Sequence, residues 1–493
     1  MSAAIHMQDS SESDAEIAPF LRVPEPLPLR GFGHLRLRWD LSTQLLRVAM
    51  PVVLGMVTQT AINILDTVMV GRLPPAEANP GQAAIGYSLN FMWLVGGFLS
   101  AIWVGTQALT SRRAGEGNSK AAGRVLTNSL LLSLSSSTAF AAIAIVLTPI
   151  LFPLYANDPV VAAYGTEYLQ IRYIGIIGMV GTFSYKSFFD GIGKTHVFMI
   201  AAGIMNLANV VLNYVLIFGA PWASIPRMGV VGAAWASAIS ATLGLITLAL
   251  WSLLPSFLRR YRYYDLKNIS MQLMRELLRL SLPNGAATIF VMAGFVLLYK
   301  VVSIVNALHA PSGNPVLATA NQVVITCLMP SFMTSLAFGS ATAAVVSQAL
   351  GAKRPDLAER YGWEAIKLWS YVMSVLGLLL FLFPDAVISL ANQDPAVIDA
   401  ARLPLRMLAV PHALIAVAAI LAQTLHGIGN ARFVMMVEGI LHFGVMSPLA
   451  YLFGVQLDWG LEGVLMGPLA YVLALAIIMF WKFRQGTWKE IVI

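Results

Sequence analysis

Residues 129–152 read SLLLSLSSSTAFAAIAIVLTPILF, a run of 24 residues without a charged side chain. A helix of this length is long enough to cross the ~30 Å hydrocarbon core of a bilayer. Of the 493 residues in the chain, 58% are hydrophobic and only 11% are charged, whereas roughly 25% are charged in a soluble domain. The sequence therefore predicts a protein whose main solvent is lipid.

Similar apolar runs recur along the chain, bounded by charged residues or by segments with Pro and Gly. They predict an all-α polytopic membrane protein with twelve transmembrane helices. The predicted helices cover residues 46–71, 83–111, 121–152, 162–187, 195–218, 229–254, 277–308, 316–349, 363–383, 399–425, 433–454 and 461–482.

Basic residues fall mainly on one side of these helices: in the tail 1–42, in the segment 255–276, and at positions such as Arg112, Lys186 and Lys353. The positive-inside rule then places both termini, 1–42 and 484–493, in the cytoplasm, and we expect the bacterial inner (plasma) membrane. The start of the chain lacks the pattern of a cleavable signal peptide. The net charge of +7 reflects this topology, so nucleic-acid binding is not expected. The single Cys327 excludes an intrachain disulfide.

The chain contains an internal repeat. LRVAMP at 46–51 returns as LRLSLP at 278–283, displaced by 232 positions, and DGIGK at 190–194 returns as HGIGN at 426–430, displaced by 236. GVVG at 229–232 likewise matches GLEG at 460–463. Six helices separate each pair, so the halves are parallel repeats related by an axis along the membrane normal. We predict an N-lobe at 43–254, a cytoplasmic linker at 255–276 and a C-lobe at 277–483, an architecture typical of alternating-access transporters.

Asp66 is the main candidate functional residue because an ionisable group deep in a membrane helix is costly. Burial would let it take up and release a proton at cellular pH, or bind Na⁺. Gln59 and Asn63 lie near one face of the same helix. The alternative is a structural carboxylate paired with an arginine such as Arg172.

Asn206, Asn209 and Asn213 are spaced by three and four residues, which aligns their amides on one helix face. Such a stripe can support a cation or a protonated carboxyl, or it can hold helices together. Lys300, which follows Tyr299 in an apolar helix, is interpreted either as a fixed counter-charge or as a side chain that snorkels to the interface.

No metal-binding, nucleophile or nucleotide-binding motif occurs in the sequence, so we expect no cofactor and no energy source other than an ion gradient, H⁺ or Na⁺. Met and aromatic residues are plentiful in 83–111 and 316–349. They suit an adaptable apolar cleft for small amphipathic, cationic organic substrates.

These residues resemble the multidrug and toxic compound extrusion (MATE) family over residues 43–483. The resemblance rests on DTVMVGRL at 66–73, SQALGA at 347–352, LNY at 212–214 and the two Gly-Ile-Gly turns. It implies two lobes arranged as a V and export of cationic drugs driven by H⁺ or Na⁺.

By this resemblance the helix 1 aspartate of the family falls on Asp66, and the Asn-x-x-x-Asp of its DinF-type branch falls on Asn209 and Asn213. The second of these positions lacks the carboxylate, which favours H⁺ over Na⁺. The second-lobe carboxylates of the NorM-type branch are replaced by apolar residues near Val291 and Ala416. The charge pattern is thus closer to the DinF type, with coupling in the first lobe.

Two other functions are weighed against cation-driven multidrug export. A flippase for lipids or polysaccharide precursors would line its cleft with several Arg or Lys residues, but Lys300 and Arg172 are nearly the only cations expected to be buried. An intramembrane enzyme would need convergent acids or a metal cluster, and the sequence indicates none. We expect a monomer surrounded by membrane lipid.

Overall fold

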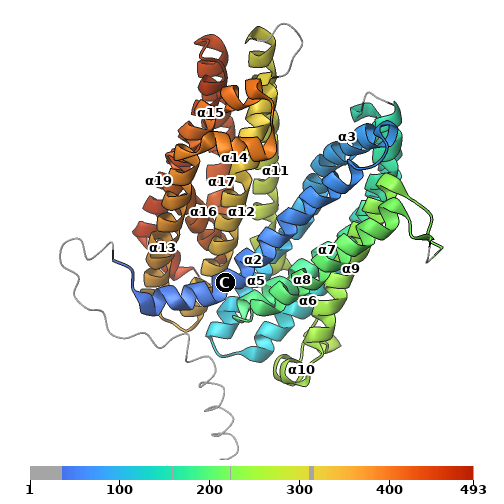
Figure 1. Cartoon of the computed structure of the whole chain (residues 1–493). Coiled ribbons are helices and arrows are strands. Elements are labelled where there is room, and N and C mark those ends of the chain that lie inside the picture. Colours follow the sequence, from blue (N-terminus) through green and yellow to red (C-terminus); the bar gives the residue numbers. More distant parts are fainter. Residues whose placement is uncertain (1–35, 157–158, 222–223, 310–315, 492–493) are drawn as a thin grey trace, which may run out of the picture. The chain divides into compact units, whose positions relative to one another are not determined.

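The computed structural model describes residues 36–156, 159–221, 224–309 and 316–491, apart from some side chains between Gln59 and Asn90. In these residues the chain forms helices joined by short turns, and the only β pairing is an isolated bridge between Ala220 and Ile225 (Figure 1). This confirms the predicted all-α class.

The first half of the chain forms six long helical segments (Figure 1). They are α2 (Trp39–Val70), the run α3 (Pro75–Met92), η2 (Trp93–Gly97), α4 (Phe98–Ser100) and α5 (Ile102–Gly115), then α6 (Ser119–Tyr155), α7 (Pro159–Gly191), α8 (His196–Phe218) and α9 (Gly229–Ser252). The short α10 (Pro255–Tyr261) and η4 (Leu266–Asn268) occupy the predicted linker.

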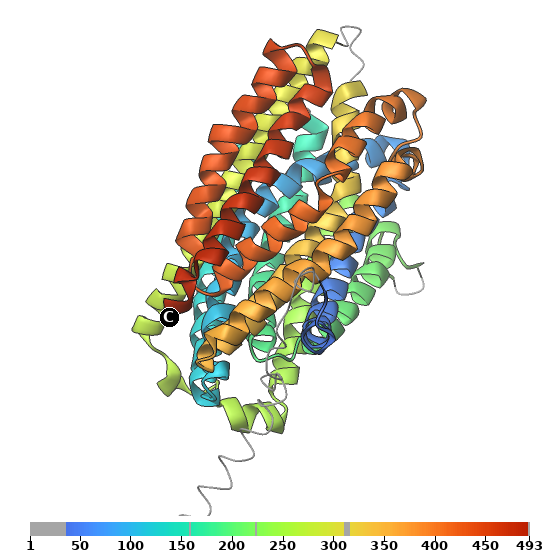
Figure 2. The same cartoon turned by 90° about the vertical axis from the view of Figure 1, so that its left-hand side faces the viewer.

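The second half repeats the series. It contains α11 (Met271–His309), α12 (Val316–Gly351), α13 (Pro355–Leu382), the short α14 (Pro384–Ala391), the pair α15 (Pro395–Ala409) and α16 (His412–Gly427), the run α17 (Ala431–Leu441), η5 (His442–Met446), α18 (Ser447–Tyr451) and η6 (Leu452–Gln456), and α19 (Gly460–Gln485). Figure 2 shows the run α17–η6 beside α19 at the red end of the chain. The short η7 (Thr487–Glu490) follows α19.

Taking each run as one helix, the described residues contain the twelve predicted helices. Ten are long and apolar enough to span a membrane, and the pair α15–α16, bent by 58°, makes an eleventh. The twelfth, α7, falls outside this group and carries Glu167, Arg172, Lys186 and Asp190 along its length.

The first helix begins earlier than predicted, at Trp39 rather than at residue 46. The prediction followed the apolar run, whereas the helix continues into a polar turn held by Glu364 of α13. The Glu364 carboxylate accepts hydrogen bonds from the backbone nitrogen of Arg38 at 2.6 Å and from Ser42 Oγ at 2.7 Å. A predicted tail boundary at residue 42 therefore falls inside a helix.

The repeat extends to this anchor. At the start of α11 the backbone nitrogen of Ser270 donates to Asn128 Oδ1 at 2.8 Å. Ser270 lies 232 positions after Arg38, and Glu364 lies 236 positions after Asn128, which are the displacements of the sequence repeat. Each copy thus fixes the start of a first helix on a third helix, with a carboxylate in one case and an amide in the other.

The chain divides into two compact units. One holds Met50–Ala114 and Asn118–Gly285; the other holds the described residues up to Ala49, Gly115–Gly117 and the described residues from Ala286 onward. The predicted boundaries 43–254, 255–276 and 277–483 stay a prediction.

Within the first of these units α7 and α9 pack backbone to backbone. A Cβ added at Gly175 would lie 2.8 Å from Ala238 Cα, and one added at Gly178 would lie 2.9 Å from the backbone nitrogen of Thr242. Small residues permit this close approach, which is a common way for helices to associate in lipid. It fixes the position of the α9 segment that precedes Ala238, and this segment carries Ser237.

Candidate functional site

Asp66 lies near the end of α2 with only 5% of its surface exposed. Its Oδ1 accepts a hydrogen bond from Asn213 Nδ2 at 2.5 Å, and its Oδ2 accepts one from Ser237 Oγ at 2.8 Å. Both carboxylate oxygens therefore have neutral donors, one from α8 and one from α9.

Asn209 joins the two donors into a network. Asn213 Nδ2 also donates to Asn209 Oδ1 at 3.0 Å, and Asn209 Nδ2 donates to Ser237 Oγ at 3.4 Å. The Oδ1 atom of Asn213 is buried and has no hydrogen-bond partner. The network thus holds Asp66 from two sides and retains one unused acceptor beside it.

The period of α8 explains why these amides converge. Asn206, Asn209 and Asn213 are 9%, 3% and 0% exposed, whereas Leu207 and Tyr214 on the other side of the helix are 68% and 65% exposed. Residues three and four positions apart lie on the same side of a helix. The predicted amide face of this segment therefore points into the bundle.

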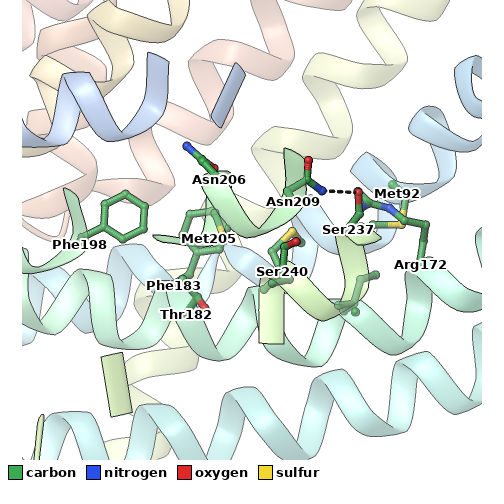
Figure 3. Close-up of a pocket in the computed structure, with 14 residues that line it drawn as sticks. Met92, Arg172, Thr182, Phe183, Phe198, Met205, Asn206, Asn209, Ser237 and Ser240 are labelled. Carbon is green, nitrogen blue, oxygen red and sulfur yellow. Dashed lines mark hydrogen bonds between the residues drawn. The ribbon is translucent and has the colours of Figure 1, made fainter. Parts of the chain in front are cut away.

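A cavity of about 90 Å³ adjoins the network (Figure 3). Met and Phe side chains form much of its wall, and its polar lining consists of Arg172, Thr182, Asn206, Asn209, Ser237 and Ser240. Drug-sized ligands occupy pockets of roughly 300–1,000 Å³, so this cavity holds several water molecules rather than a whole drug. It offers a polar approach to the residues that bond to Asp66.

Arg172 lines the cavity but does not pair with Asp66. No nitrogen of Arg172 lies within 4.0 Å of an Asp66 oxygen, and its Nε is buried without a hydrogen-bond partner. Its guanidinium carbon lies 6.0 Å from the centre of the Tyr168 ring. The structure therefore shows no ion pair of the kind considered as the alternative role for Asp66.

A single family model, MatE, matches the chain twice, at residues 51–215 and again at 287–452. The two matches begin 236 positions apart, which is the displacement of the repeat. The chain belongs to the MatE family. As a MatE protein it is a membrane transporter and not an enzyme.

Curated relatives of this MatE chain span nearly its whole length. "Probable multidrug resistance protein NorM" of Thermotoga maritima is 24% identical over 457 residues, covering 92% of this chain and 94% of its own length. "Multidrug resistance protein NorM" of Burkholderia vietnamiensis is 26% identical over 453 residues, covering 90% of this chain and 93% of its own. These similarities support a multidrug transporter.

Solved structures agree on the MatE fold. The outward-facing conformation of a multidrug resistance MATE family transporter of the MOP superfamily matches with a TM-score of 0.82 at 22% identity, covering 95% of this chain and 100% of that one. A MOP superfamily transporter from Pyrococcus furiosus, described as having a binding pocket of reverse polarity, matches with a TM-score of 0.81, also at 22% identity, covering 95% of this chain and 100% of that one.

The predicted MatE site residues fall into separate groups. The structure brings Asp66, Asn209 and Asn213 together, and Asn206 and Arg172 line the adjoining cavity. The side chains of Gln59 and Asn63 lie outside the described residues.

Tyr299 and Lys300 belong to α11 in the other compact unit, where both side chains are exposed. The Tyr299 hydroxyl donates to Gln322 Oε1 at 3.1 Å. The expectation that Lys300 is a buried cation is therefore wrong.

A different lysine of this MatE chain is the buried one. Lys186 was expected among the basic residues of the cytoplasmic side, yet it is 4% exposed and its Nζ lies 2.7 Å from Asp190 Oδ2. The same Nζ lies over the Phe198 ring at 5.2 Å. The spacing of four residues between Lys186 and Asp190 on one helix was the available sequence signal.

Two other features escaped sequence reasoning. Ser237 donates to Asp66 but lies in α9 among Ala and Gly residues. Its only sequence signal is that it is a small polar residue in a predicted membrane helix. Glu438 of α17 is an acid within a predicted membrane helix of the second half, and its charge was the available sequence signal. Among the described residues no group of three or more His, Cys, Asp or Glu side chains is placed to hold a metal ion.

Proposed function

We propose that this MatE transporter exports small amphipathic organic cations in exchange for protons, and that Asp66 is the group that carries the proton. The observation behind the proposal is that both oxygens of a buried membrane carboxylate are held by neutral donors, Asn213 and Ser237. A buried carboxylate that makes no direct ion pair is more readily neutralised by a proton than one in a salt bridge.

The hydrogen-bond network suits both states of Asp66. When the carboxylate is ionised, Asn213 and Ser237 donate to it. When it is protonated, its hydroxyl can donate to Ser237 Oγ or to the unused Oδ1 of Asn213. Neither state leaves the acid without a partner, so exchange of the proton needs only small rotations of these groups.

Arg172 supplies the electrostatic link between proton and substrate. With Asp66 ionised, the two charges cancel; with Asp66 protonated, the positive charge of Arg172 on the cavity wall is uncompensated. At an effective dielectric of ~20, a second cation roughly 8 Å away is then repelled by ~2 kcal/mol. Proton uptake thereby favours release of an organic cation, as antiport requires.

Na⁺ is the alternative coupling ion, with Asp66 and the Asn213 Oδ1 as ligands. H⁺ is favoured because Asn213 stands where the DinF-type pattern has a second carboxylate, which leaves one negative charge at the site. A flippase for anionic lipids is not favoured, because the cavity wall carries a single cationic side chain, Arg172.

Purified protein in liposomes, with H⁺ and Na⁺ gradients imposed separately, tests the proposal. We expect uptake of a fluorescent organic cation driven by the H⁺ gradient, and its loss in Asp66→Asn. The matched control is Asp265→Asn. Asp265 is an exposed carboxylate in the linker, and an asparagine at this position can still accept the capping hydrogen bond from the backbone nitrogen of Lys267.

The control should transport like the wild type. Undiminished transport by D66N under the H⁺ gradient would overturn the role of Asp66. Transport driven by Na⁺ alone would overturn proton coupling and leave the site in place. Location in the inner membrane, with both termini cytoplasmic and a monomeric state, belongs to the same proposal.

A further inference from the structure

Glu438 faces the interior of its helical bundle although it belongs to a membrane-spanning helix. It shares one side of α17 and η5 with Val434, Leu441 and His442, which are 0%, 4% and 1% exposed. On the outer side Ile440 is 64% exposed. Glu438 itself is partly buried. Its carboxylate is therefore directed toward protein rather than lipid.

His442 lies one turn after Glu438 and is tightly enclosed. The ring of Tyr471, from α19, is centred 4.3 Å from the His442 ring. On the α11 side, a Cβ added at Gly294 would lie 2.5 Å from His442 Cδ2, so the helices touch at this point. Glu438, His442 and Tyr471, which we call the Glu438 cluster, thus form a polar group between three helices.

The cluster contains unused polar atoms. His442 Nδ1 lies 2.8 Å from the backbone oxygen of Glu438. A carbonyl oxygen only accepts, so Nδ1 carries the hydrogen and Nε2 has a free lone pair. In the described part of the chain, neither His442 Nε2 nor the Glu438 carboxylate has a hydrogen-bond or ion-pair partner.

The helices packed on α17 offer no counter-charge within bonding distance. Tyr471 is the titratable residue that α19 presents to Glu438. The other titratable groups are His412 and His426 on α16, Tyr299, Lys300 and His309 on the part of α11 in the same unit, and Glu462, Lys482 and Arg484 on α19. None of them bonds to Glu438 in the described structure. An unpaired carboxylate at membrane depth is costly, so this acid must bind a cation or a proton.

The backbone is irregular at the same place. The α-helix ends at Leu441 and a π-helical turn, η5, begins with His442. Ser447 Oγ donates to the His442 backbone oxygen at 2.9 Å across this turn. Such π-turns are rare and occur frequently at functional sites.

The repeat relates the cluster to the cavity of the first half. His442 lies 236 positions after Asn206, and Tyr471 lies 231 positions after Ser240, the displacements found for these parts of the repeat. Asn206 and Ser240 both line the cavity beside the Asp66 network. His442 and Tyr471 therefore occupy, in the second half, positions that correspond to a wall of that cavity, and Glu438, 236 positions after the buried Ala202, lies one turn before His442.

We propose that Glu438 is a second proton-binding group of this transporter, independent of Asp66, with His442 and Tyr471 as its positioning residues. The proton binds a carboxylate oxygen of Glu438 and leaves to water during the transport cycle. The free lone pair of His442 Nε2 is an acceptor for the protonated acid. The inference rests on the proposed proton antiport and adds a site in the other half of the chain.

Infrared difference spectra of the full-length protein in lipid, recorded from mildly acidic to mildly alkaline pH, test this without a substrate. We expect a titrating carboxylic-acid carbonyl band in the wild type, of which one component disappears in Glu438→Gln and persists in Asp66→Asn. Glu438→Asp should restore a shifted band. Asp399→Asn, which alters an exposed carboxylate in the same unit, is the matched control.

Proton release on binding of tetraphenylphosphonium gives a second measurement. It is expected to fall by about half in E438Q and by about half in D66N, because each site contributes protons linked to the same binding event. An E438Q spectrum identical to that of the wild type, or a Glu438 band that never titrates, overturns the second site. If proton release falls in D66N but not in E438Q, the second site is contradicted and Asp66 is supported. If proton release falls in E438Q but not in D66N, the second site is supported and the role of Asp66 is contradicted.

Discussion

Ser237 donates a hydrogen bond of 2.8 Å to Asp66 across the α2–α9 contact, and it accepts one from Asn209 at 3.4 Å. A single hydroxyl thus connects the buried acid to the cavity wall. The hydroxyl favours the ionised acid, because it donates to the carboxylate.

Replacing Ser237 with Ala removes one donor from the Asp66 carboxylate. A hydrogen bond to a charged group contributes about 1.5–3 kcal/mol, so Asp66 should hold its proton more tightly. We expect the pH dependence of transport to move toward higher pH by about one to two units, since 1.36 kcal/mol corresponds to one unit. Transport rates across a pH series measure this shift. Ser240→Ala, on the same helix but without a bond to Asp66, is the control, and equal profiles for both variants would contradict the prediction.

Replacing Asn213 with Asp places a second carboxylate within reach of Asp66, since the present Nδ2–Oδ1 distance is 2.5 Å. Two neighbouring carboxylates do not both ionise without a cation between them. We expect N213D to acquire stimulation of transport by Na⁺, measured at fixed pH in proteoliposomes. Asn206→Asp, farther from Asp66 on the same face, is the comparison. A sodium response that is absent from N213D would show that a second charge does not select the ion.

Replacing Arg172 with Gln removes the positive charge from the cavity wall. The repulsion of ~2 kcal/mol between this charge and an organic cation would vanish. The affinity for the cation should rise by roughly thirtyfold in R172Q, and by a similar factor at acidic and at alkaline pH, because the repulsion between Arg172 and the cation does not depend on the protonation state of Asp66. Equilibrium binding at both pH values checks this. An affinity that is unchanged or lower at both pH values would assign Arg172 a purely structural role.

Glu364 should contribute to stability through its anchor. It is 1% exposed, and its carboxylate bonds to Arg38 N at 2.6 Å, Ser42 Oγ at 2.7 Å and Lys367 Nζ at 2.5 Å. Glu364→Ala leaves the buried Ser42 hydroxyl and the half-buried backbone nitrogen of Arg38 without this acceptor, and an unpaired buried donor costs about 1–3 kcal/mol. We expect a lower Tm for E364A in detergent. The Tm is measured by size-exclusion chromatography after heating. Glu364→Gln, which retains an acceptor, should lower the Tm less than Glu364→Ala. An equal fall in Tm for both variants would show that these hydrogen bonds do not account for the stability.

The positive-inside topology is open to direct labelling. Cys327 is the only cysteine, so Cys327→Ala gives a cysteine-free background with one change. A cysteine introduced as Glu490→Cys should react with an impermeant maleimide in inside-out vesicles and stay unlabelled in intact cells. The opposite labelling pattern would invert the proposed orientation.

The sequence by itself determined the membrane class, the number of helices, the duplication and the family. These follow from local features, since each apolar run must satisfy its own backbone in lipid and each repeated turn keeps its residue types. The same reasoning placed Asp66 and the amide face of α8, because the 3.6-residue period operates within a single helix.

Only the tertiary structure decided which groups meet. Ser237 reaches Asp66 because Gly175 and Gly178 let α7 and α9 approach closely, a contact between segments far apart in the sequence. Lys186 is buried and Lys300 is exposed for a similar reason: the neighbours of a side chain depend on the face that the fold turns inward. Hydropathy measures how apolar a segment is, whereas burial and pairing are properties of several helices together.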